Sequence, residues 1–233
     1  MQSSRACTLA MEAVSKRFER GIGAVDVSFD LAAGEVVGLW GRRRSGRSTL
    51  LRLAAGVERP DAGVVRFEGE DLSRRRGGRE QIAVWHTAFP PDHGHTVARQ
   101  VAIAARRSRT PGDEVHRGAL AALARVGLAG HADATPAELD PVEIAHAALA
   151  RVLVMHPRLL VLDEPMNGLD AFAGQGLLEL IVSIARSDRI AVLLSAADVS
   201  QLGGVDRHLS ISRGVVRGVT SPAPAAVLRL RRA

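Results

Sequence analysis

The stretch VVGLWGRRRSGRST occupies positions Val36 to Thr49 and decides the fold. It begins with a continuous apolar run, Val36 to Trp40, which predicts a buried strand. A loop of glycine, arginine and serine follows, and from Ser48 to Ala55 apolar residues recur with helical spacing until Gly56. A strand, a glycine-containing loop and a helix in this order place backbone N–H groups at a helix N-terminus, where anions bind. The stretch therefore predicts an α/β fold with a phosphate site.

The loop matches the phosphate-binding pattern G-x-x-x-x-G-K-[ST] except that arginine replaces the lysine. Its residues are Gly41, Arg42, Arg43, Arg44, Ser45, Gly46, Arg47, Ser48 and Thr49. In the intact pattern, backbone N–H groups wrap the phosphates, the lysine reaches the β- and γ-phosphates and the hydroxyl ligates Mg²⁺. We expect the loop to bind phosphate, with Arg47 as a catalytic phosphate contact and Ser48 as a metal ligand. Arginine keeps the charge but has a planar fork, which favours binding over efficient phosphoryl transfer. The alternative is a surface turn rich in glycine and arginine.

A second motif, LLVLDEP, spans Leu159 to Pro165. Its apolar part predicts a buried strand that delivers two carboxylates to its C-terminal end. Because ligands of parallel sheets bind at that edge, we expect Asp163 to ligate Mg²⁺ and Glu164 to act as general base for an attacking water. Taken alone, the motif also fits a strand that ends in a solvated acidic turn. Its occurrence together with the loop favours a nucleotide site.

The rest of the chain alternates short apolar strands with helices. Strands are expected at Thr8 to Val14, Ala24 to Leu31, Val64 to Phe67, Ile82 to Trp85, Leu159 to Leu162, Ile190 to Leu194, His208 to Ile211 and Val215 to Val219. Between Thr96 and Met155 the apolar period changes to about 3.6, which predicts a block of helices, and a further helix is expected from Ala171 to Arg186. Such alternation predicts a largely parallel sheet with helices on both faces.

With both motifs in place, the chain resembles the ATP-binding subunits of ABC transporters over about residues 8 to 220. The resemblance extends to VERPDAG at Val57 to Gly63 and to NGLD at Asn167 to Asp170. It implies a P-loop NTPase fold, in which a RecA-like core with a mostly parallel sheet carries an antiparallel strand-rich edge and an inserted helical subdomain. We expect one domain over 1–233, with the core at 1–89 and 157–220, the subdomain at about 90–156 and a basic tail at 221–233.

The resemblance also implies ligands and further site residues. ATP and Mg²⁺ are the expected cofactors, and Phe18 stands where the family places an aromatic residue that stacks on adenine; the alternative is an apolar residue at a strand end. In the family, the NGLD segment and the signature segment lie at a dimer interface. The signature aligns with LDPVE, about twenty residues before the acidic motif. The expected interface residues are Leu139, Asp140, Glu143 and Asp170.

Besides the lysine replaced by Arg47, three motifs depart from the family pattern. The signature L-S-G-G-Q reads LDPVE, so the serine and both glycines are absent, although Asp140 and Pro141 can still start a helix. The switch histidine is replaced by Ala197, which cannot contact phosphate. The glutamine that links nucleotide to the membrane partner aligns with Thr87, next to His86. These losses favour ATP binding over ATP turnover.

Two functions from different classes stay open. The first is the ATP-binding subunit of an ABC transporter, which couples ATP binding and slow hydrolysis to transport by a transmembrane permease subunit. A second ATP-binding subunit, either a copy or a homologue, is then the dimer partner. The second function is a pseudo-ATPase, a nucleotide-binding regulatory or structural partner of an active homologue. Arg47 and Ala197 favour the pseudo-ATPase, whereas Glu164 counts against it because an abandoned site needs no base.

Composition limits the other classes of partner. The chain has 233 residues with 31 Lys+Arg against 25 Asp+Glu, a net charge of +6, and Lys16 is its only lysine. Such a balance is compatible with nucleic acid, an anionic membrane surface or solubility alone. The arginines are spread along the chain and no aromatic residues alternate with them, so no nucleic-acid partner is expected.

Location follows from what the sequence lacks. No apolar run approaches the roughly 20 residues of a membrane span, no secretory signal is recognisable, and Cys7 alone cannot form an internal disulfide. We therefore expect a cytoplasmic protein, held at the inner face of the cell membrane through its permease partner.

Overall fold

The central sheet of the protein has six strands in the order β10-β9-β3-β8-β7-β6. The computed structural model describes residues 7–18, 21–74, 81–85, 94–105 and 112–219. The strands are β3 (Val36–Trp40), β6 (Ile82–Trp85), β7 (Leu159–Leu162), β8 (Ala191–Ala196), β9 (Arg207–Ser212) and β10 (Val215–Val219). All neighbours run parallel except β10, which is antiparallel to β9. The predicted, mostly parallel sheet is confirmed.

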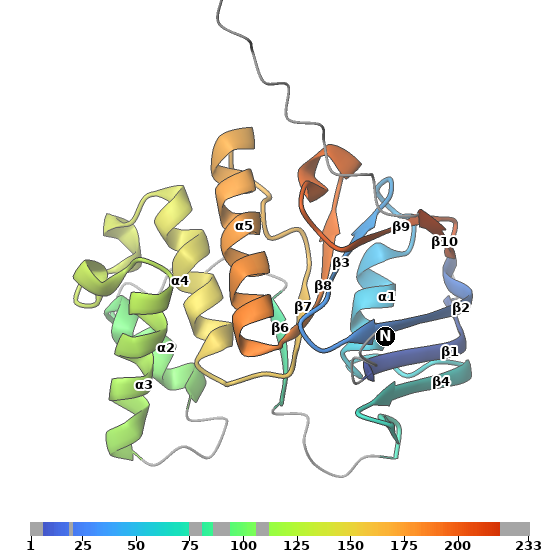
Figure 1. Cartoon of the computed structure of the whole chain (residues 1–233), viewed down its shortest axis with the longest axis horizontal. Coiled ribbons are helices and arrows are strands. Elements are labelled where there is room, and N and C mark those ends of the chain that lie inside the picture. Colours follow the sequence, from blue (N-terminus) through green and yellow to red (C-terminus); the bar gives the residue numbers. More distant parts are fainter. Residues whose placement is uncertain (1–6, 19–20, 75–80, 86–93, 106–111, 220–233) are drawn as a thin grey trace, which may run out of the picture.

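Both faces of this sheet are covered, which explains why β3 and β7 have no polar side chain. In β7, Leu159 and Val161 pack in one apolar cluster with α1 (Arg47–Ala54) and the second sheet, whereas Leu160 and Leu162 pack in another with α5 (Ala171–Asp188). Alternate residues of a strand point to opposite faces, so two buried faces require a continuous apolar run. Figure 1 shows α1 and α5 on opposite faces of the sheet.

The second sheet is antiparallel and has the order β2-β1-β4-β5. Its strands are β1 (Cys7–Phe18), β2 (Gly21–Ala32), β4 (Ala62–Phe67) and β5 (Glu70–Asp71). It forms the edge drawn at the right of Figure 1. Strand β1 runs beyond the predicted end at Val14 as far as Phe18, with register shifts against β2 where the alternating pattern breaks. The two-residue strand β5 is too short to give a sequence signal.

The predicted helical block contains α2 (Val97–Ala105), α3 (Gly112–Arg125) and α4 (Pro141–Leu153). Short 3₁₀ segments η3 (Ala129–His131) and η4 (Pro136–Glu138) lie between α3 and α4, and η5 (Val199–Leu202) follows β8. The buried residues of α2, α3 and α4 belong to the same apolar cluster as α5 and one face of the sheet. One core therefore continues from the sheet into the helices (Figure 1).

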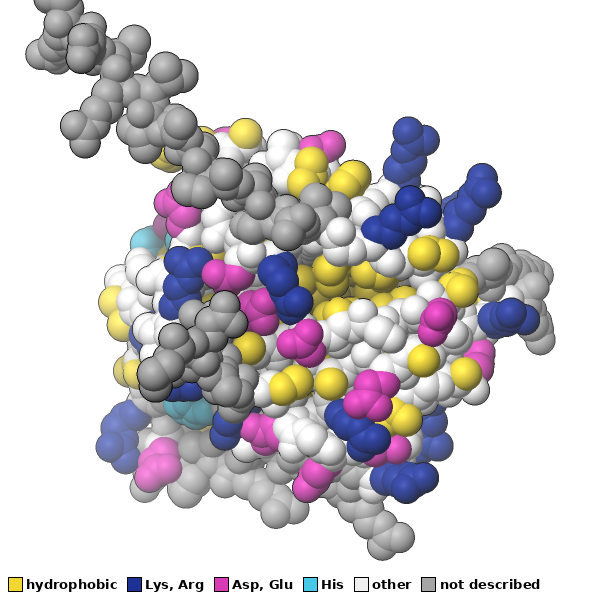
Figure 2. All heavy atoms as spheres, turned by 45° about the vertical axis from the view of Figure 1, so that its right-hand side comes forward, with side chains coloured by type: hydrophobic (Ala, Val, Ile, Leu, Met, Phe, Trp, Pro, Cys, Tyr) yellow, Lys and Arg dark blue, Asp and Glu magenta, His cyan; other side chains and the backbone are white. Residues whose placement is uncertain are grey.

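Over the described ranges, no helix combines the length and the hydropathy that crossing a membrane requires. Basic and acidic side chains lie interspersed over the face drawn in Figure 2, without a broad area of one sign. The predictions for His86, Thr87 and the tail at 221–233 lie outside the described residues.

Candidate functional site

The loop between β3 and α1 is held by close backbone packing. Ser45 N donates to the carbonyl of Arg42 at 3.1 Å, and Gly214 N donates to the carbonyl of Ser45 at 2.8 Å. A Cβ added to Gly46 would lie 2.2 Å from the carbonyl oxygen of Gly23, and Gly46 has φ +110°. A Cβ at Gly41 would meet another backbone carbonyl at 2.4 Å. Glycine is therefore required at both predicted positions.

Several donors gather where the loop enters α1. Gly46 is the N-cap of α1 and offers no side-chain acceptor to the first-turn N–H groups. The hydroxyl of Ser45 is buried and, within the described part of the chain, has no hydrogen-bond partner. Arg42, Arg43 and Arg44 are exposed around it. Free N–H groups, an unpaired buried hydroxyl and three guanidinium groups fit an anion such as the phosphates of ATP.

The two carboxylates stand at the C-terminal end of β7, as predicted. Ser195 at the end of β8 donates its hydroxyl to Asp163 Oδ1 at 2.6 Å and accepts from the Glu164 N–H at 2.9 Å. Ser195 is fully buried, and Glu164 adopts a left-handed backbone conformation, φ +48°. Ser195 therefore orients the acidic pair. This role of Ser195 was not predicted, because its only signal in the sequence is a hydroxyl at the end of an apolar strand.

Arg47 makes two contacts that the sequence did not predict. Its side chain is 8% exposed and runs from the start of α1 to the ends of β7 and β8. Nη2 lies 2.5 Å from Glu164 Oε1, and Nη1 donates to the carbonyl of Ala196. The next residue in the chain after Ala196 is Ala197, which is exposed. The predicted phosphate contact is thus an ion-pair partner of the predicted base, because the long arginine side chain reaches both strand ends.

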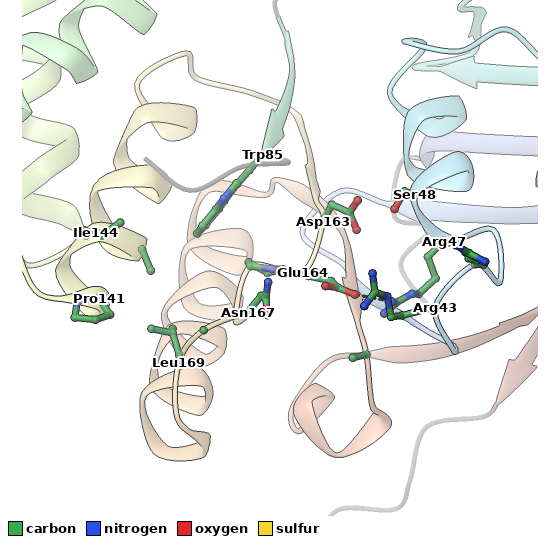
Figure 3. A pocket seen from close by; sticks show the side chains of 15 residues that line it. Arg43, Arg47, Ser48, Trp85, Pro141, Ile144, Asp163, Glu164, Asn167 and Leu169 are labelled. Atoms are coloured by element: carbon green, nitrogen blue, oxygen red, sulfur yellow. Dashed lines mark hydrogen bonds and ion pairs between the residues drawn. The ribbon is translucent and has the colours of Figure 1, made fainter. Parts of the chain in front are cut away.

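The loop, the carboxylates and the start of α4 line one cavity of about 1020 Å³. Figure 3 shows Ser48 and Asp163 facing each other from α1 and β7, the arrangement expected of two ligands of one Mg²⁺ ion. The opposite wall is largely apolar and includes Trp85, Pro141 and Ile144. The cavity lining includes these residues of the predicted site: Arg43, Arg44, Arg47, Ser48, Asp163 and Glu164.

Phe18 lies beside the loop, outside the lining of this cavity. A Cβ at Gly23 would come within 2.6 Å of Thr49 and 2.7 Å of the Phe18 ring, so Gly23 separates the two side chains. Phe18 is 41% exposed, and Lys16 Nζ stands 5.8 Å from the centre of its ring. An exposed ring next to the phosphate loop fits stacking on a base.

Lys16 is held in place by two carboxylates, Asp61 at 2.9 Å and Glu58 at 3.1 Å. The hydrogen bonds that the Lys16 ammonium donates to Asp61 and Glu58 raise the pKa of Lys16 above its ordinary value. The Arg17 N–H, followed by the Lys16 ammonium, lowers the pKa of Asp61. The only lysine of the chain therefore supports the Phe18 region and stays outside the phosphate loop.

The predicted interface residues lie at helix starts. Asp140 is the N-cap of α4 and accepts from the N–H groups of Val142 and Glu143, while Glu143 accepts from the Asp140 N–H at 2.9 Å. The predicted helix start at Asp140 and Pro141 is confirmed. Asp170 is the N-cap of α5, and Leu139 is buried. Their contacts with a second subunit stay a prediction.

Comparison with known proteins agrees with this geometry. The model of the ABC transporter family matches residues 24–167, which include the loop and both carboxylates. The lipoprotein-releasing system ATP-binding protein LolD of Pseudomonas fluorescens is 34% identical over 224 residues, covering 91% of this chain and 97% of that protein. The cell division ATP-binding protein FtsE of Escherichia coli is 33% identical, covering 90% and 97%.

Solved structures show the same fold. CbiO1 of Clostridium perfringens, part of the ABC transporter complex cbiONQ, superposes with a TM-score of 0.81 at 25% identity and covers 91% of this chain and 87% of its own. The dimeric ATP-binding cassette MJ0796 bound to ADP and Pi superposes with a TM-score of 0.79 at 21% identity, covering 92% and 99%. The resemblance seen in the motifs is confirmed: the chain belongs to the ABC transporter family, among its ATP-binding proteins.

Proposed function

We propose that the protein is the ATP-binding subunit of an ABC transporter, which binds ATP with Mg²⁺ and couples slow hydrolysis to a transmembrane permease. The observation that carries the proposal is the convergence of the phosphate loop and both carboxylates on one cavity of about 1020 Å³. Residues that lie far apart in sequence, on α1 and at the end of β7, meet there at the C-terminal edge of a parallel sheet.

Each part of the site has a separate task. The loop N–H groups and the exposed guanidinium groups of Arg42, Arg43 and Arg44 bind the phosphates, while Ser48 and Asp163 hold the metal. Ser195 keeps Asp163 oriented through its hydroxyl. Bound Mg²⁺ neutralises charge on the phosphate oxygens. Glu164 accepts the proton of the attacking water.

The dimer and the membrane partner follow from the family. The relatives act in different systems, named for lipoprotein release, aliphatic sulfonate import and cell division, at 33–37% identity to this chain. Because so similar ATP-binding proteins serve such different systems, the membrane subunit selects the cargo. We place this chain at the inner face of the membrane, bound to a permease, with a second ATP-binding subunit across the surface that carries Asp140, Glu143 and Asp170.

Steady-state phosphate release from MgATP tests the hydrolysis step. We expect slow release by the unchanged protein and a loss of about a hundredfold or more in Glu164→Gln, since removing a general base costs about 10²–10⁴ in rate. Calorimetric binding of MgATP to both proteins shows that the variant is folded and loaded. Equal background rates in two proteins that both bind MgATP would instead support the pseudo-ATPase, which the pairing of Glu164 with Arg47 favours.

A further inference from the structure

Arg47 connects three elements that border the cavity. Its backbone belongs to the first turn of α1, Nη2 contacts Glu164 after β7, and Nη1 donates to the carbonyl of Ala196 at the end of β8. The arginine side chain is 8% exposed and the glutamate side chain 34% exposed. Both terminal nitrogens of the guanidinium group therefore face protein acceptors in a largely buried position.

This arrangement depends on the residue types at two positions. A guanidinium group has two separate terminal nitrogens and can bind a carboxylate and a carbonyl at once, whereas a lysine ammonium is a single compact charge. Ala197 directly follows Ala196, whose carbonyl accepts the hydrogen bond from Arg47 Nη1. Its side chain is only a methyl group, which leaves the approach to Glu164 to Arg47. Arginine at 47 and alanine at 197 together permit the contact.

The same contact opposes two steps of the proposed reaction. While Nη1 and Nη2 are bound to Ala196 and Glu164, Arg47 cannot turn these donors towards a phosphate. While Arg47 Nη2 is bound to Glu164 Oε1, that oxygen is not available to accept a proton from water. Arg43 and Arg44 line the same cavity and are exposed, so an incoming polyphosphate meets free positive charge before it reaches the buried pair.

We propose that Arg47 is a latch: in the nucleotide-free protein it holds Glu164 in an ion pair, and a bound triphosphate opens this pair by replacing the carboxylate at the guanidinium group. Arg47 is in this role a positioning residue, because it acts through Glu164. The proposal rests on the proposed function, since it takes ATP as the ligand that opens the pair. It also couples loading of the site to release of the base.

Calorimetric titration with MgATP tests the latch in four proteins: the unchanged protein, Arg47→Lys, Glu164→Gln and the double variant. We expect Glu164→Gln to tighten MgATP binding about tenfold when Arg47 is present, because no pair has to be broken, and at most about threefold in the Arg47→Lys protein. Arg47→Lys alone should also tighten binding. Glu164→Gln also removes a negative charge near the phosphates, and this effect is the same with arginine or lysine at position 47. The difference between the two tightening factors therefore reports the ion pair alone.

Thermal unfolding supplies a second readout, independent of turnover. Without nucleotide, the change in melting temperature of the double variant should differ from the sum of the changes in the two single variants, which shows coupling between positions 47 and 164. With saturating MgATP, this difference should disappear. The matched control is the pair of Arg158 and Glu68, whose Nε and Oε1 atoms are 2.7 Å apart and which lies outside the cavity lining. Arg158→Lys and Glu68→Gln should leave the affinity for MgATP unchanged.

The outcomes separate the two proposals. If MgATP binds all four proteins and Glu164→Gln tightens binding by the same factor in both backgrounds, the latch is wrong and the proposed function stands. If none of the four proteins binds MgATP, the proposed function is wrong and the latch, which needs the triphosphate, falls with it. Both the proposed function and the latch are supported if Glu164→Gln tightens MgATP binding by a larger factor when Arg47 is present, and if MgATP removes the coupling seen in the melting temperatures.

Discussion

At the scale of single residues, the tightest constraint is the packing of Gly46 against Gly23. An added Cβ at Gly46 would sit 2.2 Å from a carbonyl oxygen, and φ +110° is a conformation that side chains rarely adopt. We expect Gly46→Ala to lower the free energy of unfolding by about 1–3 kcal/mol and to weaken MgATP binding, because the loop must move. Urea unfolding and calorimetry measure the two effects.

The matched control for this substitution is Gly176→Ala within α5. A Cβ at Gly176 would meet no atom within 4 Å, and alanine favours a helix interior. This variant should gain about 0.5–1 kcal/mol and bind MgATP unchanged. Equal stability of the Gly46→Ala and Gly176→Ala proteins would contradict the assigned loop geometry.

Asp61 gives a prediction about pH. Its pKa is lowered in the folded protein, chiefly by the Arg17 N–H and then by the Lys16 side chain. The stabilisation is therefore present above the ordinary pKa of 3.8 and is lost as pH falls through the lower, folded value. We expect Asp61→Asn, which keeps an acceptor oxygen, to lower the melting temperature at pH 7. The difference from the unchanged protein should shrink below about pH 4, as thermal unfolding across the acid range can measure. A constant difference would show that the charge of Asp61 has no role.

At the scale of elements, α4 shows how side-chain capping defines the start of a helix. Asp140 caps the N–H groups of Val142 and Glu143, and Pro141 occupies the first turn. Capping by Asp140 is the reason that the helix begins here.

Substitution of this cap separates helix stability from charge. Asp140→Ala should lower the free energy of unfolding by about 1 kcal/mol because two N–H groups lose their acceptor. Asp140→Ser, which keeps an oxygen acceptor but removes the charge, should stay close to the unchanged protein. Chemical denaturation of the three proteins measures both effects. A loss in the serine variant as large as that in the alanine variant would mean that the charge, and not the cap, stabilises α4.

At the scale of the whole molecule, the cavity joins elements from most of the chain, so ligand binding should stabilise the entire fold. A ligand at a hundred times its Kd adds about 2.7 kcal/mol to the free energy of unfolding, or about 5–10 °C for a chain of this size. We expect MgATP to raise the melting temperature by this amount in a thermal-shift measurement. Adenosine at the same concentration lacks the phosphates and should have little effect. Equal shifts with MgATP and adenosine would contradict phosphate recognition by the loop.

Local patterns in the sequence were enough to predict most elements. The bounds of β3, β6 and β7 agree with the apolar runs, those of β10 agree with the strand expected at Val215 to Val219, and Asp140 with Pro141 predicted the start of α4. These features depend on neighbouring residues alone: a strand with two buried faces is apolar throughout, and a cap acts within one turn. The phosphate loop and the acidic motif are also contiguous, which is why family and ligand could be inferred without coordinates.

Only the tertiary structure decided which side chains meet. Arg47 and Glu164 are 117 positions apart, and Ser195 and Asp163 are 32 apart, so the order of strands in the sheet brings each pair together. The sequence determined that a basic loop and a pair of adjacent carboxylates are present. Whether the arginine faces phosphate or carboxylate depends on the distance between strand ends and on the direction of one long side chain, and neither is encoded in residues adjacent to Arg47.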